Sequence, residues 1–98
     1  LRKLGLKQDF DAITLSVLHE IGHAETEEKF SDKAWDKCAE KKQALFDQSD
    51  KMPFEKYINK YWKVADENSA NKWLVNFANN YADLVQDLED IIFENMIQ

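Results

Sequence analysis

Both histidines of this 98-residue chain lie in one pentapeptide, His19-Glu20-Ile21-Gly22-His23. On an α-helix, residues four apart are separated by about 40° around the axis and about 6 Å along it, so both imidazoles project from one face. Zinc suits such a pair, because a hydrolytic zinc site typically takes three protein ligands and leaves the fourth position for water. Glu20 would lie beside that water as its general base. The spacing predicts a zinc site rather than two unrelated surface histidines.

Two histidines alone hold zinc poorly, so the site needs a third ligand. The chain's single cysteine, Cys38, lies in a separate helical pattern, where a small buried hydrophobe is its expected role. The acidic residues just after the motif are too close along the helix to turn back and are expected to form a solvated face: Glu25, Glu27 and Glu28. A carboxylate from another helix is therefore expected.

Glu67 is the better-placed carboxylate, because it opens a later helix in which Ala70 follows about one turn on. A small residue at that position lets its helix pack closely on the metal-bearing one. Taken alone, Glu67 is also an ordinary acidic residue in a first helical turn, where the helix dipole favours it.

At these residues the chain resembles the zincin metallopeptidases, and more narrowly the small phage- and prophage-encoded members akin to the ImmA/IrrE type. That group has His-Glu-x-x-His on one helix and, some tens of residues downstream, a second helix of the form Glu-x-x-Ala-Asn-x-aromatic. The matching stretches are residues 18–24, Leu-His-Glu-Ile-Gly-His-Ala, and 67–73, Glu-Asn-Ser-Ala-Asn-Lys-Trp. The resemblance implies that His19, His23 and Glu67 are ligands and Glu20 the base. Asp66 is the alternative third ligand if the register of the second stretch is off by one.

The chain departs from this group in two respects. Zincins place a small β-sheet before the metal helix, and its edge strand holds an extended peptide substrate. Only eighteen residues precede His19, without a strand pattern, and residue 1 is Leu. We therefore expect the sheet to belong to a missing upstream segment or to be absent. The second departure is that no third histidine is present to stabilise an oxyanion; the tyrosines are candidates by residue type only, and are expected to be aromatics with surface hydroxyls: Tyr57, Tyr61 and Tyr81.

The elements that must position these residues are all predicted to be helices. Only two Gly and one Pro occur, too few for the turns of a β-sandwich or barrel. Apolar spacings of three and four predict helices over about 9–28, 31–48, from 53, over 66–80 and from 83. The expected caps are Asp9 or Asp11, Ser31 and Asp66, with Pro53 in a first turn. Gly22 inside the first helix indicates a close approach there.

The expected inward residues follow from the same pattern. The first helix is expected to use Phe10, Ile13, Val17, Ile21 and Ala24, and the second Trp35, Cys38, Leu45 and Phe46. An aromatic stripe on the third helix is read as core: Phe54, Tyr57, Ile58, Tyr61 and Trp62. The fold class is mainly α, about five helices in one compact domain over residues 1–98, as a zincin-like helical core.

Charge and composition narrow the function classes. Thirteen Lys+Arg against nineteen Asp+Glu give a net charge of −6, which argues against nucleic acid as a partner, because its phosphate backbone is negatively charged. No membrane-spanning run and no leader are evident, so an intracellular location is expected. The resemblance implies the cytoplasm of a bacterial host and a Zn²⁺-dependent peptidase of phage or prophage origin, acting on a host or phage regulatory protein. The alternative is a non-catalytic interaction module that keeps a structural or vestigial metal site.

Overall fold

The structure, a computed structural model, describes residues 5–96. Within them the chain forms five α-helices, two short 3-10 turns and no strand. The helices are α1 (Ala12–Thr26), α2 (Asp32–Asp47), α3 (Phe54–Trp62), α4 (Ala65–Asn80) and α5 (Ala82–Met96), and the turns span Glu27–Lys29 and Ser49–Lys51. The predicted mainly helical class is therefore confirmed for this part of the chain.

The caps explain where the helices begin. The carboxylate of Asp11, rather than that of Asp9, accepts the Ile13 N–H at the start of α1. Ser31 caps α2 as predicted, by accepting the Ala34 N–H. The prediction that Asp66 caps the fourth helix is wrong. That helix begins at Ala65, with Val64 at the cap position, so Asp66 lies inside its first turn.

α3, in contrast, begins one residue after the expected position. Pro53 is extended and occupies its cap position rather than its first turn. A proline suits this place because it has no N–H to leave unpaired.

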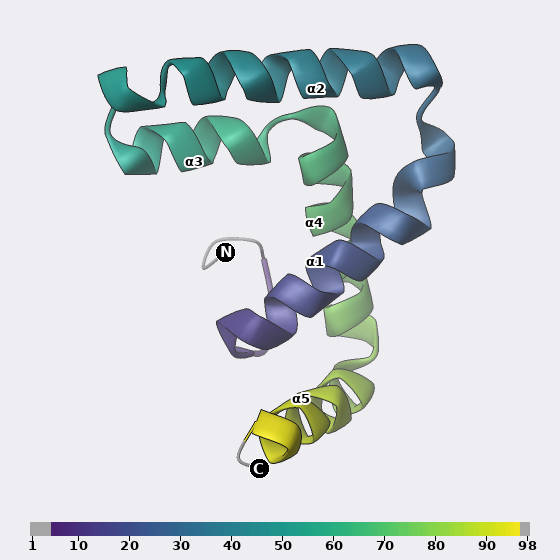
Figure 1. The fold of residues 1–98 in the computed structure, drawn as a ribbon. Coiled ribbons are helices and arrows are strands. Elements are labelled where there is room, and N and C mark those ends of the chain that lie inside the picture. The colour runs from purple at the N-terminus through teal and green to yellow at the C-terminus, as the bar shows by residue number, and fades with distance from the viewer. Residues whose placement is uncertain (1–4, 97–98) are drawn as a thin grey trace.

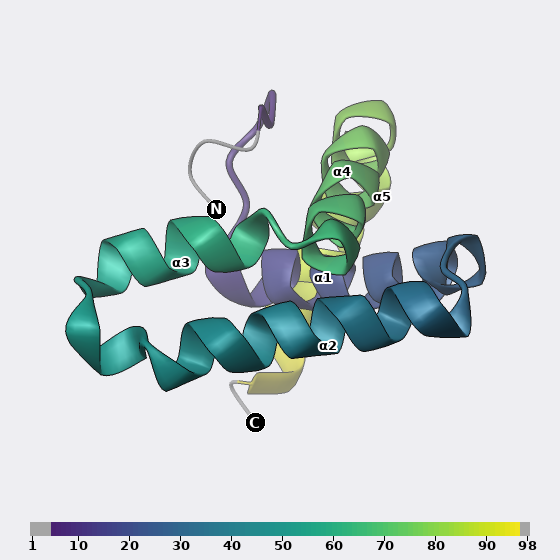
Figure 2. The ribbon, with the colours of Figure 1, turned by 90° about the horizontal axis from the view of Figure 1, so that it is seen from above.

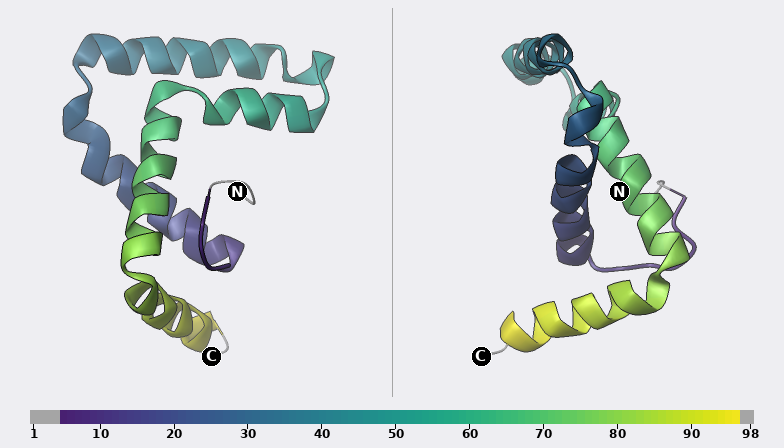
Figure 3. Two further views of the ribbon diagram at one scale, coloured as in Figure 1. Left: turned by 180° about the vertical axis from the view of Figure 1, so that it is seen from behind. Right: turned by 90° about the vertical axis from the view of Figure 1, so that its right-hand side faces the viewer.

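α1 and α4 cross at the centre of the molecule and form its most extensive helix contact (Figure 1). α2 and α3 form an antiparallel hairpin at one end of this pair, and α5 lies at the opposite end (Figure 3). Figure 2 shows the two helices of the hairpin side by side from above. The C-terminal half of α1 therefore lies nearer the hairpin, and its N-terminal half nearer α5.

The apolar core lies at the α5 end of the crossing. It consists of Leu15, Leu18, Leu74, Ala78 and Val85. The predicted inward face of the first helix is wrong at Ile13, Ile21 and Ala24, which are exposed. Phe10 and Val17 are half-buried, and Phe10 packs against the core. The face that α1 buries is rich in small and polar residues: Thr14, Leu15, Leu18, His19, Gly22 and Thr26. Hydropathy spacing missed this face because polar side chains with buried partners count as outward-facing in such a pattern.

The aromatic stripe of α3 is not a core element. No residue of α3 is fully buried, and Phe54 is 76% exposed. Phe46 of α2, also expected inside, is 64% exposed. The α2–α3 hairpin contacts α4 near the first turns of α4, and none of the other described elements covers the outer faces of the hairpin (Figure 1). The stripe instead turns its last two residues, Tyr61 and Trp62, toward the polar end of the α1–α4 crossing.

Candidate metal centre

The second half of α1 carries the His-Glu-x-x-His residues. The imidazole of His19 is buried, that of His23 is half-buried, and Glu20 is exposed. The Nε2 atoms of His19 and His23 lie 3.0 Å apart, as the four-residue helical spacing predicts. Both imidazoles therefore point at one place beside α1.

Glu67 from the first turn of α4 reaches the same place. Its Oε2 lies 2.7 Å from Nε2 of His23 and 3.5 Å from Nε2 of His19. Glu67 is buried, and Oε2 receives no aligned hydrogen bond from any described residue. A buried carboxylate oxygen without a hydrogen bond costs free energy unless a cation is bound to it. These three residues together form a group that could hold a metal ion.

The spacing of the three atoms fits a metal of zinc's size. The three donor atoms lie 2.7–3.5 Å from one another, close enough for His19, His23 and Glu67 to hold one such ion together. With three protein ligands, a coordination position would remain for water. The donor set of two imidazoles and one carboxylate is also of a kind that zinc accepts.

The far side of the His19 ring is held in place. Its Nδ1 lies 2.7 Å from Oδ1 of Asn71, which is buried one turn after Glu67 on α4. With Nδ1 donating to this oxygen, Nε2 is the nitrogen left to bind a metal. The ring of Trp62 packs edge-on against that of His19, with centroids 5.1 Å apart. These two neighbours fix the orientation of the imidazole.

The second oxygen of Glu67 is also held. Its Oε1 accepts a hydrogen bond of 2.9 Å from the Tyr61 hydroxyl and lies 3.6 Å from Nζ of Lys42. Lys42 pairs most closely with Asp66, at 2.5 Å, and its ammonium lies over the Tyr61 ring. The hairpin thus fixes one oxygen of Glu67 and leaves Oε2 facing the two imidazoles.

These contacts set the ionisation of Glu67. Burial alone would raise its pKa, but the contact with His19 and the hydrogen bond from Tyr61 oppose that effect. The positive charges of His23 and Lys42 add to the opposition, and the pKa of Glu67 falls to about 2. Burial and the bond to Glu67 raise the pKa of Tyr61 above its ordinary value. The carboxylate therefore stays ionised at neutral pH, while the phenol stays a hydrogen-bond donor.

The same carboxylate acts on His19. Its contact with Glu67 raises the pKa of His19 above 6.5, although burial acts in the opposite direction. Asn71 and the negative charge of Glu20 raise it further. The site thus has a strongly cation-attracting field even where only protons are available to bind.

Gly22 explains how the two helices come close enough for one site. A Cβ at this position would lie 2.7 Å from the backbone oxygen of Ala70 on α4. Both residues are buried, and the Thr26 hydroxyl donates to the Gly22 carbonyl at 2.8 Å. The close approach that the sequence indicates at Gly22, and the small residue it identifies at Ala70, therefore meet each other.

The structure brings together three of the predicted site residues, His19, His23 and Glu67, and leaves Glu20 exposed beside them. Asp66, the alternative ligand, is 2% exposed and turned to Lys42 instead. The acidic residues that follow the motif are exposed as expected, and Cys38 is buried outside this cluster.

Sequence reasoning missed several supporting residues. The prediction that the Tyr61 hydroxyl lies at the surface is wrong, because it donates to Glu67. Asn71 had a signal, since it is the asparagine of the second stretch and lies one turn after Glu67. Lys42 had none, because its pairing with Asp66 joins residues 24 apart in the chain.

No family model matches the sequence, and no curated protein or solved structure matches it significantly. Among the described residues, no helix is both long enough and apolar enough to cross a membrane.

Proposed function

We propose that this chain is a zinc-dependent peptidase whose metal is held by His19, His23 and Glu67. The observation that carries the proposal is the convergence of two imidazole nitrogens on a buried carboxylate oxygen that lacks an aligned hydrogen bond. When bound, zinc would polarise a substrate carbonyl and lower the pKa of a coordinated water to about 7.

The chain's own residues have distinct roles in this proposal. Glu20 takes the proton of the attacking water and later delivers it to the departing amine. Its exposure and its place next to His19 on α1 support this role, because a base must reach both water and substrate. Asn71 and Trp62 keep His19 oriented, while Tyr61 and Lys42 keep Glu67 oriented. The resemblance to phage and prophage zincins favours a protein substrate, with a host or phage regulatory protein as the class.

A second candidate is a non-catalytic interaction protein with a structural metal. The observation that favours it is the position of the cluster across the α1–α4 contact, where an ion would join two helices. The tyrosines add to it. The Tyr61 hydroxyl donates a hydrogen bond to Glu67, and the Tyr57 ring stacks on that of Tyr61. The Tyr81 ring packs at a tilt against Phe77 at the end of α4. None of the three is placed by these contacts as an oxyanion donor.

Glu20→Gln separates the two candidates. The matched control is Glu25→Gln, at another exposed position on the same helix. Zinc content and the cleavage of a random peptide library, read by mass spectrometry, are measured for both. The peptidase proposal expects Glu20→Gln to keep zinc and lose at least about 100-fold in cleavage rate, with Glu25→Gln unchanged. If Glu20→Gln cleaved peptides at the wild-type rate, the base role of Glu20 would be contradicted. A zinc-loaded wild type that cleaves nothing, yet melts far lower in chelator, would favour the structural candidate.

A further inference from the structure

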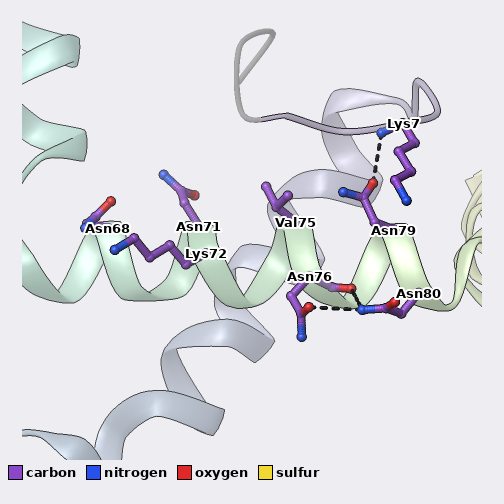
Figure 4. A pocket seen from close by; sticks show the side chains of 8 residues that line it. All are labelled: Lys7, Asn68, Asn71, Lys72, Val75, Asn76, Asn79 and Asn80. Atoms are coloured by element: carbon purple, nitrogen blue, oxygen red, sulfur yellow. Dashed lines mark hydrogen bonds between the residues drawn. The ribbon is translucent and has the colours of Figure 1, made fainter.

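The outer face of α4 carries a groove of about 500 Å³ that no part of the proposed mechanism uses. Five asparagines and two lysines dominate its lining, to which no carboxylate from residues 5–96 contributes (Figure 4). Asn68, Asn71, Val75 and Asn79 stand on one side of the helix, at spacings of three and four. Carboxamides thus follow one another along the length of α4.

One of these asparagines already binds backbone of the segment before α1, which bends at Lys7 and has a positive φ of 89° at Gly5. Oδ1 of Asn79 accepts the Lys7 N–H at 2.8 Å (Figure 4), and Nδ2 of Asn79 donates to the Gly5 carbonyl at 3.1 Å. An extended peptide presents the same pair of groups on one side, the C=O of one residue and the N–H two residues later. A carboxamide can therefore bind a peptide backbone here without reading its side chains.

The other half of the groove has the same chemistry without an occupant from the described residues. Asn76 and Asn80 bond to each other, whereas none of the described residues bonds to the Asn68 side chain. Asn71 gives its Oδ1 to His19, which leaves its Nδ2 to donate toward the groove. From Asn68 to Val75 the helix rises about 10 Å, the length of about three extended residues.

The charge of the groove selects among peptides. Lys7 and Lys72 are its two charged lining residues, and neither ammonium forms an ion pair with another described residue. The chain as a whole has a net charge of −6, so this face differs in sign from the molecule's average. Acidic side chains in an extended peptide would complement the two lysines.

We propose that the α4 groove binds an extended peptide segment bearing acidic side chains, with Asn68 and Asn71 holding its backbone and Lys72 its charge. This inference goes beyond the proposed function, because the groove meets His19 only through Asn71, at Nδ1 rather than at the nitrogen assigned to the metal. Asn71 joins the two places, because its oxygen contacts the metal-ligating ring while the groove contains its nitrogen.

The test is a titration of the ¹⁵N-labelled, zinc-loaded chain with two blocked decapeptide libraries, one acidic and one basic at alternate positions. Side-chain amide signals are assigned with Asn68→Ala. We expect the acidic library to shift the Asn68 and Asn71 signals and to bind at least about tenfold more weakly to Lys72→Glu. Lys33→Glu, at an exposed position on α2, is the matched control and should bind the acidic library as the wild type does.

Three outcomes would overturn the inference. They are equal shifts with the basic library, shifts confined to the apolar groove around Leu84 and Ile91, and no shift up to about 1 mM peptide. Zinc affinity is measured separately, and Lys72→Glu should leave it unchanged. His23→Ala should lose zinc but keep the peptide-induced Asn68 shift, so failure of the groove and failure of the metal site are distinguishable.

Discussion

The two ends of the α1–α4 crossing use opposite chemistry on the same pair of helices. Toward α5 the contact is apolar, built from Leu15 and Leu18 of α1, Leu74 and Ala78 of α4, and Val85 of α5. Toward the hairpin it is polar, and its buried polar and charged residues are His19, Thr26, Asp66, Glu67 and Asn71. The apolar end gains free energy from burial alone. The polar end buries charge, which is costly unless each group is paired.

The difference between the two ends indicates where a bound metal would stabilise the fold. Removing an ion should leave the apolar end intact and weaken the polar end, because only the latter contains a carboxylate oxygen with no aligned donor. We expect the two ends to respond separately to substitution.

Leu74→Ala should damage the apolar end most. Leu74 is fully buried, so the loss of its side chain should cost about 2–5 kcal/mol in the free energy of unfolding by urea. Zinc affinity of the folded fraction should stay within about twofold, since this end contacts no ligand. Leu84→Ala, at a position 56% exposed, is the control and should cost less than about 1 kcal/mol. A zinc affinity that collapses in Leu74→Ala would show that the two ends are not separable.

Gly22→Ala should separate the helices at the polar end. Its Cβ would meet the backbone of Ala70, which cannot move aside as a flexible side chain would. We expect a loss of about 1–3 kcal/mol in the free energy of unfolding, despite alanine's better helix propensity, together with weaker zinc binding. Ser16→Ala, exposed on the same helix, should change neither quantity. A Gly22→Ala protein more stable than the wild type would refute the close-approach account.

Tyr61→Phe should act on the metal site with little effect on the fold. Removal of the hydroxyl frees one oxygen of Glu67, and supporting contacts of this type are typically worth about 10–100-fold in metal affinity. Tyr57→Phe, one turn earlier on α3, is the matched control. Zinc affinity is measured by competition with a chelating dye. Equal affinities for the two variants would exclude Tyr61 as a positioning residue.

The stability of the metal-free chain and the extra stability gained from zinc should depend on pH in opposite directions. The folded-state pKa of His19 is raised above 6.5, so its contribution to stability is full below 6.5 and is lost as pH rises through the folded value. The pKa of Glu67 is lowered, so its contribution holds above its ordinary range and is lost only as pH falls through about 2. Zinc needs unprotonated imidazoles, so its stabilisation should grow with pH.

Urea unfolding at about pH 6 and about pH 8, in chelator and in zinc, measures both trends. Metal-free stability should fall between the two pH values, while the increment from zinc should rise. Metal-free stability that instead increases toward pH 8 would contradict the assignment of His19 as a partner of Glu67.

The helices and the pairing of the two histidines were predictable from the sequence because both depend on local spacing. The four-residue interval of His19 and His23 fixes their common face, and Ser31 marks the start of α2. Glu67 was singled out because it opens a later helix with Ala70 about one turn on, and the resemblance to zincins implied its role as a ligand. That Glu67 meets the two histidines depends on how α1 and α4 pack.

The orientation of the elements was not predictable in the same way. The buried face of α1 is set by the contact between Gly22 and Ala70 and by polar side chains with distant partners, which a hydropathy pattern cannot register. The aromatic stripe of α3 looked like core because the pattern does not tell whether another layer covers it. Lys42 and Tyr61 became site residues only through tertiary contacts with α4.

Zinc titration calorimetry of matched variants tests whether His19, His23 and Glu67 bind one metal ion. The wild type should bind about one zinc ion per chain, and His23→Ala and Glu67→Gln should each lose at least about 100-fold in affinity. Asp66→Asn, checked for folding by circular dichroism, should still bind zinc, because Asp66 is turned to Lys42. Absence of zinc binding by the wild type, or undiminished binding by Glu67→Gln, would contradict the claim.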